Sequence, residues 1–96
     1  MYGTVARMRL KPGAEGQMKA LMAEYEGLKI PGYRGELIYR GDRDPDEYFM
    51  AVLFDSKETY LANANSPEQH QRYQRYRQLL VADPEWHDGE VVFSNL

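Results

Sequence analysis

Residues 47–54, with the sequence EYFMAVLF, are apolar at almost every position and decide which folds are open to this chain. Successive side chains of a β-strand point to opposite faces. One face of this strand would carry Tyr48, Met50, Val52 and Phe54, and the other Phe49, Ala51 and Leu53. A strand that is apolar on both faces must be covered on both sides. We therefore predict that residues 47–54 form a strand packed between two layers.

The flanking sequence supplies the other elements of a small sheet. GTVARMRL (3–10) is strand-like, the apolar spacing over 15–29 predicts a helix, and residues 33–40 form a second strand. Asp55 and Glu58 make a capping-box pattern for a short helix, and Ser66, with Pro67 after it, begins the next one. DPEWHDG (83–89) is predicted to be a loop, and EVVFSN (90–95) the last strand.

This order, β-α-β-β-α-β, is typical of an α+β, ferredoxin-like fold with a four-stranded antiparallel sheet and helices on one face only. We expect residues 1–96 to form a single domain. The other face of the sheet would be costly to leave in water, at about 25 cal/mol per Å² of apolar surface. We therefore predict a homodimer in which two sheets pack face to face. The alternative is a monomer whose loops fold over the bare face.

Composition excludes several classes of function. A net charge of −3 creates no field that would attract nucleic acid. The absence of cysteine rules out thiol catalysis, cysteine-based zinc sites and disulfides. No apolar run approaches the roughly 18 residues that a membrane span needs. We expect a cytoplasmic protein with neither nucleic-acid nor membrane partners.

The sequence predicts no metal site. DRDPDE (42–47) carries aspartates at alternate positions, as a calcium loop does, but Pro45 interrupts it and Leu53 stands where a bidentate glutamate belongs. A solvated hairpin tip is the better interpretation. His70 and His87 are the only histidines, and neither has another histidine three or four residues away.

A helix predicted to begin at Ser66, within SPEQHQRYQRYRQLL (66–80), is unusual because its inward stripe is rich in tyrosine. Tyr73, Tyr76 and Leu80 are spaced to share one face, and His70 lies one turn before Tyr73. A buried tyrosine hydroxyl needs a hydrogen-bond partner. Either this stripe lines a cavity that holds a ligand, or it belongs to a tyrosine-rich core satisfied by local hydrogen bonds. His70 lies either at the edge of that cavity or simply at the surface.

Four stretches resemble the antibiotic biosynthesis monooxygenase family: VARMRLKPG (5–13), PGYRG (31–35), FDSKETYLANANSPEQHQRY (54–73) and GEVV (89–92). The resemblance spans essentially the whole chain. It implies a dimeric α+β barrel with a pocket inside each protomer, between sheet and helices. Members of the family include cofactor-free oxygenases of hydroquinones and polycyclic phenols, and haem-degrading enzymes.

The resemblance favours the phenol-oxidising branch. The haem-degrading branch has an asparagine, a tryptophan and a haem-ligating histidine where this chain has Ala6, Asn63 and Tyr73. Haem is therefore not expected, and no cofactor is predicted. Asn63 and Tyr73 are similar to part of the set used by the phenol-oxidising branch, whereas Trp86 is expected in a loop and is not equated with the family's helix tryptophan.

The resulting hypothesis is a cofactor-independent monooxygenase acting on a small phenolic or quinol-type aromatic. His70 would be the base, because an unperturbed imidazole pKa near 6.5 suits proton abstraction. Tyr73 and Asn63 would orient the substrate oxygens. The wall of the pocket would be formed by Tyr25, Met22, Met8 and Tyr76. The alternatives are a dimer that binds a small molecule without converting it, and a structural dimer with a filled core.

Overall fold

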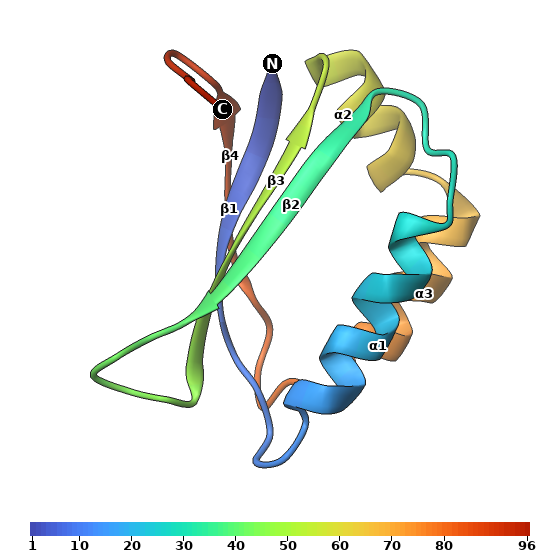
Figure 1. Cartoon of the computed structure of the whole chain (residues 1–96). Helices are drawn as coiled ribbons and strands as arrows, with labels where there is room; N and C mark the ends of the chain where they lie inside the picture. Colours follow the sequence, from blue (N-terminus) through green and yellow to red (C-terminus); the bar gives the residue numbers. More distant parts are fainter.

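The computed structural model describes residues 1–96 as a sheet with helices packed against one face (Figure 1). Its elements, in chain order, are β1 (Tyr2–Arg9), α1 (Glu15–Glu26), β2 (Tyr33–Arg40), β3 (Glu47–Phe54), α2 (Lys57–Ala64), α3 (Pro67–Arg77) and β4 (Glu85–Glu90). All neighbouring strands are antiparallel, in the order β2-β3-β1-β4. The predicted ferredoxin-like α+β architecture with a four-stranded antiparallel sheet is confirmed.

Strand β3 lies inside the sheet, as its two-faced apolar pattern predicts. Met50 pairs with Ala6 of β1 on one side and with Ile38 of β2 on the other. These side chains face the helices, and Met50 and Phe54 are only 6% and 1% exposed. The register thus places the even-numbered residues of β3 in the core.

The helix starts follow from local hydrogen bonds. Ser66 caps α3, because its hydroxyl accepts from the backbone N–H of Gln69, and Pro67 occupies the first turn, as predicted. The cap of α2 is Ser56 rather than Asp55. Its side chain accepts from the Thr59 N–H, and the Thr59 hydroxyl oxygen in turn accepts from the Ser56 N–H. The prediction was off by one residue because both side chains are good caps, and the end of β3 leaves Asp55 outside the helix.

Two predicted boundaries are wrong. Helix α1 ends at Glu26, with Gly27 as its cap, and does not continue to residue 29. The last strand is Glu85–Glu90, which was predicted to be mostly loop, and not residues 90–95. The physical reason is pairing: Tyr2, at the start of β1, is already opposite Glu90, so little of β1 remains for later residues to pair with. Beyond Glu90, one backbone bond remains, from Val91 N–H to the Met1 carbonyl at 2.9 Å.

The core lies between the sheet and the helices. Its buried members come from β1, α1, β3, α3 and the segments beside them: Ala6, Met8, Leu10, Ala14, Met18, Tyr48, Met50, Tyr76 and Leu80. None of the helices is long and apolar enough to span a membrane.

The opposite face of the sheet is apolar and uncovered in the single chain. Val5, Leu37 and Tyr39 are 52%, 51% and 57% exposed. Tyr39 stacks on Phe49 of β3, with ring centroids 5.2 Å apart. Leu37 pairs with Ala51, and both Leu37 and Tyr39, in the middle of β2, point away from the helices. This bare surface is the one that the predicted dimer would cover.

Candidate functional site

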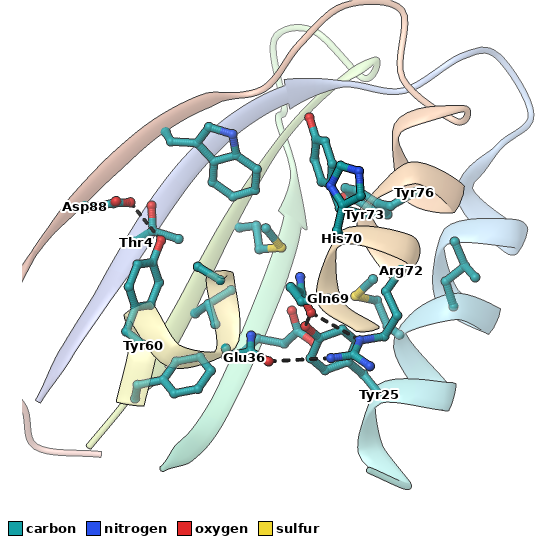
Figure 2. A pocket seen from close by; sticks show the side chains of 18 of the residues that line it. Thr4, Tyr25, Glu36, Tyr60, Gln69, His70, Arg72, Tyr73, Tyr76 and Asp88 are labelled. Atoms are coloured by element: carbon teal, nitrogen blue, oxygen red, sulfur yellow. Dashed lines mark hydrogen bonds between the residues drawn. The ribbon is translucent and has the colours of Figure 1, made fainter. Parts of the chain in front are cut away.

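A cavity of about 400 Å³, here called the sheet–helix cavity, lies between the helices and the core-facing side of the sheet. Nineteen residues line it, and eleven of them are hydrophobic, so its wall is mostly apolar. Figure 2 shows polar side chains entering it from several elements. A concave, largely apolar space with a few converging polar groups is the usual form of a small-molecule site.

The structure brings most of the sequence-predicted site residues to this cavity. Its lining includes the three predicted catalytic residues and three of the four predicted wall residues: Asn63, His70, Tyr73, Met22, Tyr25 and Tyr76. Met8 is not part of the lining. It is 3% exposed in the core, where the hydroxyl of Tyr76 donates to its Sδ at 2.8 Å. The roles assigned to these residues stay predictions.

Tyr73 and Tyr76 differ in what their hydroxyls contact. Tyr76 is buried and uses its hydroxyl on Met8, so it is largely a core residue. Tyr73 is half-buried, and its hydroxyl makes no hydrogen bond within the chain. Burial, followed by the charge of Asp83, raises the pKa of Tyr73, so its phenol remains a neutral donor. Helix α3 therefore contributes Tyr76 to the core and Tyr73 to the lining of the cavity.

The sequence predicted that Trp86 lies in a loop, but the structure places it on β4. It pairs with Ala6 in the sheet register and lines the cavity, with its ring centroid 6.2 Å from that of Tyr73. An indole and a phenol thus approach each other from β4 and α3. The other residues of β4 are polar or glycine, so the sequence does not indicate a strand there. Only the pairing of β4 with β1 shows that Trp86 reaches the cavity.

His70 lies at the edge of the cavity. It is exposed, and its Nε2 is 3.2 Å from Nε2 of Gln74, one turn further along α3. A base at this position would meet only the outermost part of a bound molecule. Asn63 is half-buried, and its Oδ1 accepts a hydrogen bond from the Arg72 guanidinium at 3.5 Å.

Two arginines line the cavity, and Arg72 is the one without an acidic partner, because Arg75 pairs with Glu24 at 2.8 Å. The Nε of Arg72 donates to Gln69 Oε1 at 3.1 Å, and its guanidinium lies over the ring of Tyr25 at 5.1 Å from the centroid. The Tyr25 hydroxyl also donates to Gln69. Figure 2 shows Tyr25, Gln69 and Arg72 grouped beside the helices. Because these contacts hold the guanidinium of Arg72 in place, its positive charge is directed at the cavity.

A second polar group lies at the opposite side of the cavity. Tyr60 on α2 donates its hydroxyl to Asp88 Oδ1 on β4 at 2.9 Å, and burial with this contact raises the pKa of Tyr60 to about 12. Next to it, Thr4 Oγ1 is enclosed and makes no hydrogen bond (Figure 2). Tyr60, Asp88 and Thr4 thus form a second polar end of the cavity.

Glu36 was not predicted as a site residue. It lies on the core-facing side of β2, opposite Val52, and lines the cavity. A bulge between Tyr33 and Gly35 brings Tyr33 to the same face, where its hydroxyl donates to Glu36 Oε1 at 3.1 Å. Burial raises the pKa of Glu36. A signal existed in the sequence: Glu36 is two residues from Ile38, so a β-strand that buries Ile38 also turns Glu36 inward.

No cluster of three or more histidine, cysteine or acidic side chains is arranged to hold a metal ion. The cavity lining offers phenols, an indole, an imidazole, the carboxyl groups of Glu36 and Asp88, and the guanidinium groups of Arg72 and Arg75.

Comparison with solved structures identifies many proteins of the same fold. A proposed antibiotic biosynthesis monooxygenase from Chloroflexus aurantiacus is 26% identical, with a TM-score of 0.77 over 98% of this chain and 95% of that one. A variant of SnoaB, a cofactor-independent oxygenase from Streptomyces nogalater, is 14% identical, with a TM-score of 0.81 over 98% and 95%. No curated protein sequence matches significantly. The family model for antibiotic biosynthesis monooxygenases matches residues 1–76, and the chain belongs to that family.

Proposed function

We propose that this protein is a cofactor-independent monooxygenase that oxidises a small phenolic or quinol-type aromatic molecule in the sheet–helix cavity. The observation that carries the proposal is the mostly apolar cavity of about 400 Å³ into which a few polar groups converge. Its volume suits a small aromatic ligand, since small-molecule sites commonly measure about 300–1,000 Å³. The shared fold with SnoaB, a cofactor-independent oxygenase, supports the same class of chemistry.

The reaction needs no external electron donor, because the substrate itself is the reductant. The substrate hydroxyl loses its proton, and the resulting anion transfers an electron to O₂. One oxygen atom then enters the ring as a carbonyl, and the other leaves as water with two hydrogens from the substrate. Apolar walls would protect the radical pair from water, and hydrogen-bond donors would stabilise the anion. Asn63 and Tyr73 would orient the substrate oxygens, with Met22, Tyr25 and Tyr76 forming the wall.

Oxygen uptake tests this function directly. Protein treated with a chelator is mixed with a panel of hydroquinones and polycyclic phenols in an oxygen electrode, and the products are identified by mass spectrometry. We expect one O₂ consumed per substrate and one oxygen atom retained in the product. A rise in melting temperature without oxygen uptake would instead identify a binding protein. The absence of both oxygen uptake and a rise in melting temperature would favour a structural dimer.

We also propose that residues 1–96 act as one domain and that two chains form a homodimer through the bare sheet face. The exposed side chains Val5, Leu37 and Tyr39 support this arrangement. An obligate interface of this kind buries on the order of 2,000 Å² or more in total. Each protomer would keep its own cavity, because the cavity and the bare face lie on opposite sides of the sheet.

Removal of the Tyr73 hydroxyl should separate ligand binding from stability. Tyr73→Phe leaves no partner unsatisfied, so the free energy of unfolding should change by less than about 0.5 kcal/mol. Binding of a phenolic ligand should weaken roughly threefold to tenfold, the value of one hydrogen bond. Tyr76→Phe is the matched control, with a cost of about 1 kcal/mol in stability and little effect on binding. Calorimetric titration and urea unfolding of both variants provide the measurements, and the reverse pattern would place Tyr73 in the core.

A further inference from the structure

The proposed reaction begins with loss of a proton, and the residue that accepts it must reach the bound hydroxyl. His70 lies exposed at the edge of the cavity, with its Nε2 next to Gln74. Glu36 is the alternative that the fold brings inside. It projects from β2, a strand of the sheet, and therefore from a rigid element rather than from the mouth.

One carboxylate oxygen of Glu36 is used and the other is free. Oε1 accepts the hydroxyl of Tyr33 at 3.1 Å. Oε2 makes no hydrogen bond within the chain. It is nevertheless not enclosed, since the only enclosed side-chain oxygen or nitrogen without a hydrogen-bond partner is Thr4 Oγ1. Since Glu36 lines the cavity, its free oxygen is accessible to a bound molecule. The hydrogen bond from Tyr33 fixes the orientation of the carboxylate.

The surroundings of Glu36 strengthen it as a proton acceptor. No arginine, lysine or histidine forms an ion pair with it, so its charge is not neutralised. Burial raises its pKa, as does Glu26 at the end of α1, while the Tyr33 hydrogen bond opposes them. A more basic carboxylate lies closer to the pKa of a phenol and takes its proton more readily. The other titratable groups of the cavity lining are Tyr25 on α1, Tyr60 on α2, His70, Arg72, Tyr73, Arg75 and Tyr76 on α3, and Asp88 on β4.

We propose that Glu36 is the general base of this site: its Oε2 accepts the proton of the substrate hydroxyl. The substrate O–H bond breaks, its electron pair remains on the substrate oxygen as a phenolate, and the proton forms the Oε2–H bond of a neutral carboxylic acid. No electron is transferred in this step. The guanidinium of Arg72, held by Gln69 and Asn63, is the cation of the cavity without an acidic partner and stabilises the anion. The inference rests on the proposed function, but its proton transfer can be observed without oxygen.

The variant Glu36→Gln tests the assignment. The amide keeps the size of the side chain and an oxygen that can accept from Tyr33, but it cannot take a proton. We expect oxygen uptake to fall by about 10²-fold or more. The wild type should lose activity as the pH falls through the raised pKa of Glu36, because the protonated acid cannot accept a proton, and the variant should lack this acidic limb. Glu58→Gln, which removes an exposed carboxylate outside the cavity lining, should retain both rate and limb.

The substitution Glu36→Gln should lower the activity of the protein without lowering its stability. A carboxyl whose pKa is raised on folding stabilises the protein only when protonated and costs free energy above that pKa. Glu36→Gln should therefore melt at or above the wild-type temperature at pH 8. A variant that is stable and inactive separates loss of a base from loss of the fold.

An anaerobic titration distinguishes this inference from the monooxygenase proposal. A phenol that absorbs differently when ionised, such as 1,8-dihydroxyanthraquinone, is added without O₂. We expect the phenolate spectrum with the wild type and with His70→Gln, and the neutral spectrum with Glu36→Gln. A wild type that ionises the phenol but consumes no oxygen would overturn the oxygenase and keep the base. An unchanged rate in Glu36→Gln, loss of ionisation in His70→Gln, or a neutral spectrum in the wild type would overturn Glu36.

Discussion

Leu53→Asp should abolish dimer formation. Leu53 lies on the odd-numbered face of β3, opposite Gly3 of β1 and Gly35 of β2, and it is only partly covered within one chain. In a sheet-to-sheet dimer an aspartate there would be a buried charge without a partner, which costs several kcal/mol. Light scattering at micromolar concentration should then report the mass of two chains for the wild type and of one chain for the variant. Unfolding should occur at a lower temperature, because dimerisation stabilises the folded state.

The matched control is Leu61→Asp. Leu61 is a leucine on α2 that is 40% exposed, so the same substitution places its charge in water. This variant should remain dimeric, with a change in stability of less than about 1 kcal/mol. A single-chain mass for the wild type would exclude the dimer. In that case Leu53→Asp should be nearly neutral, since its carboxylate would face solvent.

Phe54→Ala should cost about 3–5 kcal/mol of stability, as large-to-small substitutions of buried aromatics do. Phe54 is 1% exposed, and its ring packs edge-on against those of Tyr33 and Tyr60, with centroids 5.6 and 5.7 Å away. These two tyrosines hold Glu36 and Asp88 by their hydroxyls. Removing the ring therefore leaves a void next to the cavity and loosens two of its polar groups. We expect oxygen uptake to fall with stability.

Phe93→Ala deletes the same ring from a side chain that is 80% exposed, beyond the end of β4. Its free energy of unfolding should stay within about 0.5 kcal/mol of the wild type. Urea unfolding followed by Trp86 fluorescence, at one fixed protein concentration, compares the two variants. A cost below about 1 kcal/mol for Phe54→Ala would mean that the site can collapse around the missing ring.

The amino-acid sequence determined the elements whose signals are local. The two-faced pattern of residues 47–54 identifies the inner strand, and Ser66 with Pro67 marks the start of α3, because a hydroxyl capping its own helix depends only on its neighbours. The tyrosine spacing also placed Tyr73 and Tyr76 on the inward side of that helix. It did not separate the core role of Tyr76 from the cavity position of Tyr73, since that difference depends on Met8, 68 residues away in the chain.

The tertiary structure alone decided the last strand and the composition of the cavity. EVVFSN reads as a strand and EWHDGE does not, yet β1 pairs with the polar segment, because strand pairing is set by the register and length of the partner. The same register brings Trp86 to the cavity, and the bulge before Gly35 turns Tyr33 toward Glu36. Whether a side chain of a strand faces core or solvent changes with a shift of one residue. The fold class could therefore be predicted from local patterns, whereas the residues that meet in the cavity come from separate strands and helices and are selected only when those elements pair and pack.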